Sequence, residues 1–126
     1  MHTGSCLCGR VAFRIDGDLP LPVACHCGQC CKRSGHYWAS TPVPDARFQL
    51  TREDGLRWFE ASDTAKRGFC STCGAFLFWK AHDGAQISIA MGAIEAPTGM
   101  ALRGHIFIAD KGDYYDIADG LPQQAQ

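Results

Sequence analysis

Residues 70–79 read CSTCGAFLFW, a pair of thiols and a glycine followed by an apolar run that is typical of a strand. Two thiolates separated by two residues can face one ion across a tight turn, and Zn²⁺ takes sulfur ligands at about 2.3 Å in tetrahedral geometry. Gly74 allows a left-handed backbone that points an amide at a sulfur. A thioredoxin-type redox pair has the same spacing, but it precedes a helix. The stretch therefore favours half of a structural zinc site.

A second pair of thiols near the amino terminus predicts the other half of that site. Residues 6–9 read CLCG, and here too a glycine and then a strand follow the thiol pair. If the two strands run side by side, both pairs meet at one end of the sheet. The predicted four-ligand site consists of Cys6, Cys8, Cys70 and Cys73. Metal binding of this kind contributes on the order of 10–16 kcal/mol to folding in model peptides.

The segment CHCGQCC, which begins at Cys25, predicts a different kind of site. Cys25, Cys27 and Cys30 supply three thiolates on a loop that leads into a short helix. Three protein ligands and one open position are the arrangement of a catalytic zinc, because the open position can hold water or substrate. A second structural zinc is the alternative, with His26, Cys31 or a distant histidine as its fourth ligand.

Length, composition and charge limit the classes of protein that the chain can belong to. The chain has 126 residues, of which 46% are hydrophobic and 20% charged, so we expect one globular domain over residues 1–122 and a flexible tail over 123–126. The net charge of -1 gives no general attraction to nucleic acid or to a membrane surface. Without an apolar leader or span we expect a cytoplasmic protein, in which the 8 cysteines stay reduced and serve as ligands or reactive thiols. The sequence carries no signal for an oligomeric state.

Hydrophobic periodicity favours strands over helices along the whole chain. Strands are expected at residues 11–15, 47–51, 56–60, 75–80, 86–91 and 105–109. The pair Asp54-Gly55 predicts a hairpin between the second and third of these strands, and Asp83-Gly84 predicts one between the fourth and fifth. The one expected helix runs from Gly28 to Ser34 and ends at Gly35. The expected fold class is therefore mainly β, a small domain of antiparallel sheets with one short helix.

The order of the cysteine motifs resembles that of the glutathione-dependent formaldehyde-activating enzyme family. The motifs are GSCLCG at residues 4–9, CHCGQC at 25–30 and FCSTCG at 69–74, and the closing region HIFIADK, Tyr114-Tyr115 and DGLP at 119–122 is also similar. The resemblance covers essentially the whole chain and implies an Mss4-like fold stitched by two zinc ions. It implies a structural zinc on Cys6, Cys8, Cys70 and Cys73, and a second, more labile zinc on Cys25, Cys27 and Cys30.

The activity that the resemblance implies is that of a carbon–sulfur lyase, which makes S-(hydroxymethyl)glutathione from glutathione and formaldehyde. The leading hypothesis makes Cys25, Cys27 and Cys30 catalytic, with the substrate sulfur at the open zinc position and His26 or a bound water as the proton donor. The carboxylates of glutathione predict contacts with cations. The candidates are Lys32, Arg33, Arg67 and Lys111.

A non-enzymatic, zinc-stabilised module that binds a partner or senses redox state is the alternative. A closed tetrahedral second site would favour this alternative, since it leaves no position for substrate. Seven bound thiolates and two Zn²⁺ would change the net charge from -1 to about -4, and the added charge would lie at the metal sites.

Overall fold

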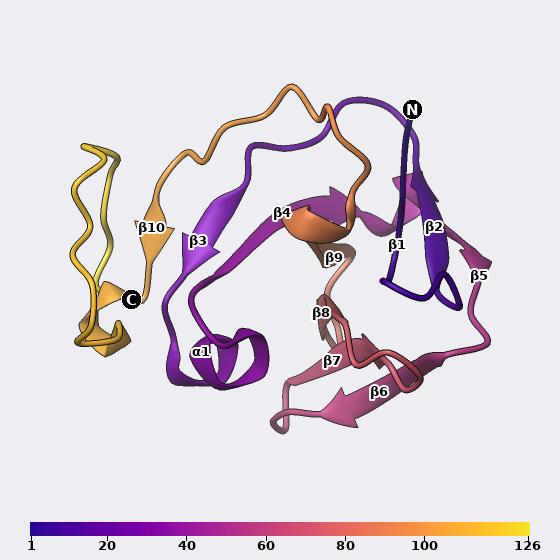
Figure 1. The fold of residues 1–126 in the computed structure, drawn as a ribbon, viewed down its shortest axis with the longest axis horizontal. Coiled ribbons are helices and arrows are strands. Elements are labelled where there is room, and N and C mark those ends of the chain that lie inside the picture. Colours follow the sequence, from indigo (N-terminus) through magenta and orange to yellow (C-terminus); the bar gives the residue numbers. More distant parts are fainter.

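Ten β-strands, one α-helix and three short 3₁₀ helices make up the computed structural model, which describes residues 1–126 (Figure 1). A three-stranded antiparallel sheet has the order β1-β2-β5, with β1 at His2–Ser5, β2 at Ala12–Ile15 and β5 at Phe48–Arg52. A seven-stranded sheet has the order β10-β3-β4-β9-β8-β7-β6, in which only β10 and β3 are parallel. Its strands are β3 (Val23–Cys25), β4 (Trp38–Pro44), β6 (Leu56–Glu60), β7 (Ala65–Cys70), β8 (Phe76–Ala81), β9 (Gln86–Ala90) and β10 (His105–Ile106). The helices are α1 (Gly28–Ser34), η1 (Asp45–Arg47), η2 (Met91–Ala93) and η3 (Ile108–Asp110).

This architecture confirms the predicted mainly β fold with one short helix. The helix α1 has 7 residues, and no helix of the structure is long and apolar enough to span a bilayer. Cys27 caps its amino terminus, where its sulfur accepts a hydrogen bond from the backbone of Cys30, and Gly35 ends it in the left-handed conformation at φ 87°. The predicted pairing of residues 75–80 with 86–91 is also confirmed, since β8 and β9 are antiparallel neighbours.

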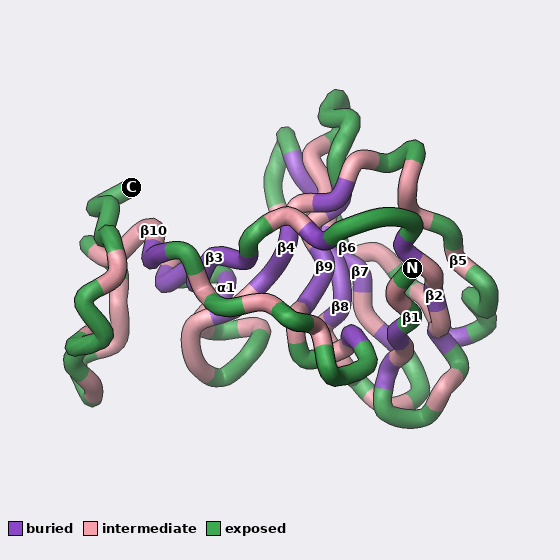
Figure 2. The backbone as a smooth tube through the Cα atoms, turned by 90° about the horizontal axis from the view of Figure 1, so that it is seen from above, coloured by how far each residue is buried: buried purple, intermediate pink, exposed green.

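Aromatic side chains hold the two sheets together. The ring centroids of Phe13 on β2 and Phe78 on β8 are 5.5 Å apart, and Phe48 on β5 lies 5.4 Å from Phe78. Phe13 and Ile15 are buried while Arg14 between them is partly exposed, as the alternation of residues 11–15 predicts. Burying one such ring contributes about 1.5–3 kcal/mol. Buried residues therefore concentrate in the strands at the middle of the molecule (Figure 2).

The predicted hairpin between residues 47–51 and 56–60 is wrong. The strand β5 pairs with β2, and β6 pairs with β7, so the two strands belong to different sheets. The turn between them leads the chain from one sheet to the other. Gly55 is required there by a close approach, because a Cβ atom at this position would lie 2.8 Å from the sulfur of Cys70.

The expected strand at residues 105–109 is shorter than predicted. Only His105 and Ile106 pair with β3, because Phe107 adopts the left-handed conformation at φ 55° and the chain turns into η3. Residues 123–126, which were expected to form a flexible tail, run beside this segment. Backbone hydrogen bonds join Gln124 to His105 and Ile108, and Ala109 to Ala125.

Candidate metal and thiol sites

Four cysteine thiols meet where the two sheets adjoin. Cys6 and Cys8 lie in the turn between β1 and β2, and Cys70 and Cys73 lie at the turn between β7 and β8. The four sulfur atoms lie within 4.8 Å of one another, and the sulfur of Cys8 is 3.7 Å from those of Cys6 and Cys70. Sulfur ligands around a tetrahedral Zn²⁺ are about 3.8 Å apart, given a Zn–S distance of about 2.3 Å. This cluster, called the four-cysteine cluster below, therefore fits a four-coordinate metal ion.

The two turns of the four-cysteine cluster have a common local design. Gly9 and Gly74 both adopt the left-handed conformation, at φ 84° and 81°. Backbone amides donate hydrogen bonds to the sulfur atoms, from Val11 to Cys6 at 3.3 Å and from Cys73 to Cys70 at 3.5 Å. Such amides favour the thiolate form that a metal ligand requires.

The four thiols come together by a route that differs from the expected one. The strands that follow the two thiol pairs, β2 and β8, are not neighbours in one sheet but belong to the two different sheets. They approach through the Phe13–Phe78 contact between the sheets. The four-cysteine cluster thus links the two sheets of the domain.

Three further thiols form the second cluster, called the three-cysteine cluster below. Cys25 ends β3, Cys27 caps α1 and Cys30 lies in the first turn of this helix, and their sulfur atoms lie within 4.8 Å of one another. Cys31 does not join them, because its thiol donates a hydrogen bond to the backbone carbonyl of His26 at 3.4 Å. The cluster could hold a metal ion with three protein ligands.

A buried cation stands beside the three-cysteine cluster. Arg67 on β7 is only 4% exposed and forms no salt bridge with a carboxylate. Its Nη1 lies 3.7 Å from the sulfur of Cys30, and its Nε donates a hydrogen bond to Gln29 at 3.0 Å. Because a buried charge is costly unless it is paired, the thiolates of the cluster are the natural counter-ions of this guanidinium.

The electrostatics of the three-cysteine cluster favour a thiolate at neutral pH. The hydrogen bond with the Cys30 thiol lowers the pKa of Cys25 to about 6, and Arg67 adds a smaller contribution in the same direction. The same hydrogen bond and burial raise the pKa of Cys30. In the metal-free protein, therefore, Cys25 ionises before Cys30.

A cavity of about 270 Å³ lies beside the three-cysteine cluster. Its lining consists of Val23, Cys25, Cys27, Cys30, Trp38, Ser40, Arg67, Trp79, Ser88, Ile106 and Phe107. Apart from Arg67, this lining carries no formally charged side chain other than the thiols themselves. A groove of about 880 Å³ runs past the four-cysteine cluster, and none of the three thiols lines it. The cavity is thus the space into which the three-cysteine cluster opens.

His26 lies outside this cavity, in a hydrogen-bonded network whose two histidines are buried and which no sequence motif predicted. Its Nε2 is 2.9 Å from Nδ1 of His105, whose Nε2 is 2.7 Å from the carboxylate of Asp119. Its Nδ1 is hydrogen-bonded to the hydroxyl of Tyr115. Burial lowers the pKa of His26, and the hydrogen bond with His105 lowers that of Asp119.

The sequence contained a signal that His26 points away from the three-cysteine cluster. Successive residues of an extended segment point to opposite sides, so that Cys25 and Cys27 face the cluster while His26 faces away from it. The partners of His26, which are His105, Tyr115 and Asp119, all lie in the closing region of the sequence, whose resemblance to the family gives these residues no role.

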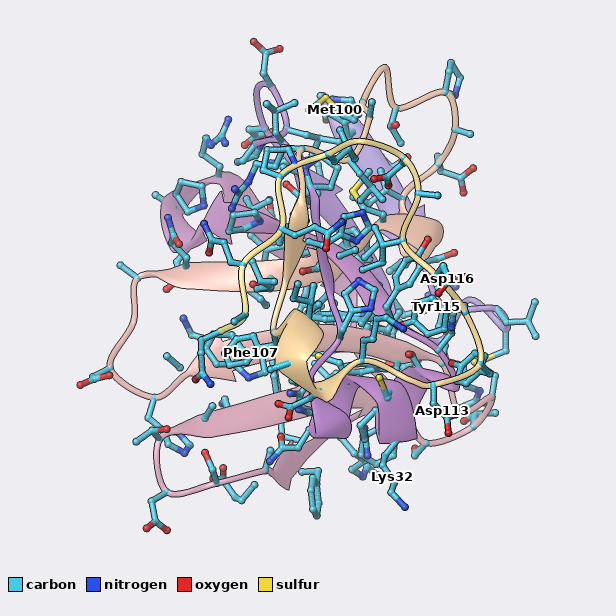
Figure 3. All side chains as sticks on the ribbon, turned by 90° about the vertical axis from the view of Figure 1, so that its left-hand side faces the viewer. Lys32, Met100, Phe107, Asp113, Tyr115 and Asp116 are labelled. Atoms are coloured by element: carbon cyan, nitrogen blue, oxygen red, sulfur yellow. The ribbon has the colours of Figure 1, made fainter.

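Three of the four candidate cations share one pocket, and the fourth, Lys111, lies elsewhere. Lys111 donates hydrogen bonds to the backbone carbonyls of Gly112 and Tyr115, and its ammonium lies 4.8 Å from the ring of Tyr115. Lys32 is exposed and extends outward from α1 (Figure 3). Lys32, Arg33 and Arg67 line a pocket of about 410 Å³ that contains no acidic side chain. Arg67 lines both this pocket and the cavity, so the two spaces adjoin.

Together, the fold and the clusters define a small β domain with a four-thiol cluster between its sheets and a second, three-thiol cluster that opens into a cavity. The chain belongs to the glutathione-dependent formaldehyde-activating enzyme family, whose sequence model matches residues 1–110. The resemblance seen in the cysteine motifs is thereby confirmed.

The chain is also similar to one curated protein in sequence and to one solved structure in fold. A Schizosaccharomyces pombe protein described as an uncharacterized lyase is 24% identical over 123 residues, which cover 94% of this chain and 86% of that protein. A crystal structure of a Rhodobacter sphaeroides protein superposes with a TM-score of 0.67 and 20% identity, covering 82% of this chain and 98% of that one. The structural likeness supports the fold. The family and the lyase relative support a glutathione-related lyase activity.

Proposed function

We propose that this protein is a zinc-dependent carbon–sulfur lyase that joins glutathione and formaldehyde in S-(hydroxymethyl)glutathione and catalyses the reverse reaction. The observation that carries the proposal is the convergence of Cys25, Cys27 and Cys30, without a fourth protein ligand, on the wall of a cavity. Three ligands and an open position are typical of a catalytic zinc. A zinc ion held there would keep a substrate thiol in its thiolate form at neutral pH.

The residues of the chain then position the reactants and balance the charge. The thiolate sulfur forms a bond to the carbonyl carbon, the electron pair of the C=O π bond moves to oxygen, and that oxygen takes a proton. The cavity holds both reactants in one place, which removes the entropic cost of their encounter from the chemical step. His26 is hydrogen-bonded at both ring nitrogens and does not line the cavity, so we assign the proton to a water molecule.

The four-cysteine cluster has a structural role in this proposal. A zinc ion with four thiolate ligands has no open position for substrate. Its ligands come from turns on both sheets, so that metal binding there stabilises the arrangement of the sheets.

The alternative, a non-enzymatic module, makes a different prediction about the three-cysteine cluster. X-ray absorption combined with metal analysis counts the sulfur ligands of each zinc ion. An average of between three and four sulfur ligands per zinc ion, with one exchangeable oxygen or nitrogen ligand at the ion of the three-cysteine cluster, supports the lyase. Four sulfurs at both ions would contradict it.

Calorimetric titration of the zinc-loaded protein with glutathione should show binding at millimolar or lower concentration. Glutathione dimethyl ester should bind about 10-fold or more weakly, because hydrogen bonds to charged groups contribute about 1.5–3 kcal/mol and the ester offers Lys32 and Arg33 no carboxylate. No binding of glutathione at millimolar concentration would overturn the choice of this thiol.

Replacement of Arg67 by methionine should weaken zinc binding to the three-cysteine cluster by roughly 10- to 100-fold, the usual cost of losing a group that supports a ligand. Competition with a chromophoric chelator measures this affinity. Arg33→Met is the matched control, since the Arg33 guanidinium lies 5.2 Å from the ring of Phe76, much like that of Arg67 at 5.5 Å, but has no hydrogen bond to a thiol. Equal zinc affinities in the two variants would refute this role of Arg67.

A further inference from the structure

The cavity beside the three-cysteine cluster is larger than formaldehyde requires. Its volume of about 270 Å³ corresponds to roughly nine water molecules at about 30 Å³ each. Formaldehyde has one carbon and one oxygen, and the sulfur end of a thiol adds only a few atoms more. This volume includes the space of a metal ion between the three thiols, but a metal ion, a sulfur and a one-carbon carbonyl compound would fill only part of it.

The walls of this unused space are apolar. Its five apolar side chains come from four strands and from the residue before η3, and they are Val23, Trp38, Trp79, Ile106 and Phe107. Val23 and Trp38 are only 8% and 7% exposed. A one-carbon substrate would leave the parts of these side chains that face the cavity in contact with water, which is unfavourable.

Phe107 is held at this wall by an uncommon backbone conformation. It is the one residue other than glycine with a positive φ, at 55°, and a bulky side chain is a rare occupant of this region. Such conformations persist where the surrounding structure enforces them, and they are frequent at ligand sites. Here the turn ends β10 and brings Phe107 to the cavity, beside η3 and above α1 (Figure 3).

Two hydroxyl groups interrupt the apolar lining. Ser88 on β9 pairs with Pro42 on β4, and Ser40 on β4 pairs with Ala90, so the two serines lie diagonally on the same face of neighbouring strands. Both line the cavity. A pair of hydroxyls in an apolar space can orient one small polar group, such as the oxygen of an aldehyde or of its adduct.

The body of a charged thiol does not suit this space. Glutathione carries two carboxylates and an ammonium group, whereas the only cation of the cavity is Arg67, which Gln29 and Cys30 already engage. The neighbouring pocket offers Lys32 and Arg33 instead. The neighbouring pocket therefore suits the charged body of the thiol, only its sulfur end would reach the three-cysteine cluster, and the rest of the cavity is left for the carbonyl substrate.

We propose that the cavity binds the apolar substituent of the carbonyl substrate, and that the protein forms and cleaves thiol adducts of aliphatic or aromatic aldehydes larger than formaldehyde. This inference rests on the proposed function and extends its substrate class. The bonds made and broken are the same as with formaldehyde. The S–H bond of the thiol breaks and its proton goes to the solvent, one C–S bond forms, and the carbonyl π pair moves to oxygen. That oxygen takes one proton from water, so that no net proton is gained or lost.

The test compares aldehydes of increasing length with one thiol. NMR exchange spectroscopy gives the rate of adduct formation and breakdown with and without the zinc-loaded protein, for formaldehyde, propanal, pentanal and benzaldehyde. The catalysed rate relative to the spontaneous rate should rise by roughly two- to fourfold per methylene, as expected for burial of each group, until the cavity is full. A rate enhancement that is flat or falls beyond formaldehyde overturns the inference and leaves the proposed function intact. No enhancement with any aldehyde, formaldehyde included, overturns both.

A variant with a larger side chain in the cavity tests whether the aldehyde binds there. Ser88→Leu should lower the enhancement for pentanal at least fivefold more than that for formaldehyde. Gln86→Leu, on the same strand but exposed and outside the cavity, is the matched control and should leave the ratio between the two aldehydes unchanged. An unchanged ratio in a folded Ser88→Leu protein places the aldehyde elsewhere and overturns the inference. If Ser88→Leu does not fold, the aldehyde series in the unmodified protein still decides the matter.

Discussion

Replacing Cys70 by alanine is expected to unfold the domain. Cys70 is fully buried in the four-cysteine cluster, which joins turns of both sheets. Structural zinc contributes on the order of 10–16 kcal/mol in model peptides, whereas the net stability of a domain is about 5–15 kcal/mol. Loss of one of four ligands should therefore remove most of the free energy of folding. Far-UV circular dichroism should show loss of strand structure, and metal analysis should show the loss of at least one zinc ion.

The control for this experiment is Cys31→Ala. Cys31 also lies among the cysteine motifs, but its sulfur belongs to neither cluster. Its removal should leave the zinc content unchanged and the unfolding transition within a few degrees of its original temperature. If Cys70→Ala also unfolds at nearly the original temperature, metal binding at the four-cysteine cluster is not what stabilises the fold.

Replacing Cys27 by alanine is expected to abolish catalysis while the fold persists. Mutation of a residue that only supports a metal ligand typically lowers metal affinity or activity 10- to 100-fold. Loss of the ligand itself should therefore lower the rate of adduct exchange by at least about 100-fold. The cost in stability is that of a helix cap, about 1 kcal/mol, since the Cys27 sulfur accepts the Cys30 amide. For a chain of this length that corresponds to a fall in melting temperature of roughly 3–6 °C.

Cys27→Ser separates the two contributions of this residue. A serine hydroxyl can still cap the helix, so the melting temperature should stay close to that of the original protein. The hydroxyl does not replace a thiolate ligand at neutral pH, so the activity should remain as low as in Cys27→Ala. If both variants unfold as Cys70→Ala does, the three-cysteine cluster is structural and the catalytic assignment is wrong.

Local patterns in the sequence predicted the elements whose cause is itself local. The alternation around Phe13 gave β2, the pair Asp83-Gly84 gave the hairpin of β8 and β9, and Gly35 marked the end of α1. Each of these depends on residues close together in the chain. The thiols within each motif could be grouped for the same reason, because a glycine after a closely spaced thiol pair is a local signal, whereas the meeting of Cys6 and Cys8 with Cys70 and Cys73 depends on the packing of the two sheets.

The predictions of strand pairing and strand length were wrong where a segment far away in the sequence determines them. Asp54-Gly55 carries the signal of a hairpin, yet β5 and β6 find better partners in β2 and β7, and Gly55 serves the close approach to Cys70. The strand at His105 stops early because Phe107 turns toward the cavity, a contact that no local pattern contains.

The sequence by itself determined which thiols form each set of donor atoms, but it left Cys31 open as a fourth ligand of the second set, and only the structure excludes it, because its thiol donates to the carbonyl of His26. Only the tertiary structure decided what surrounds the thiols. Arg67 is 37 residues from Cys30 along the chain, and Asp119 reaches His26 only through His105. Metal ligation is local because short turns set the sulfur spacing, whereas counter-charge, burial and cavity shape arise when strands remote in sequence pack together.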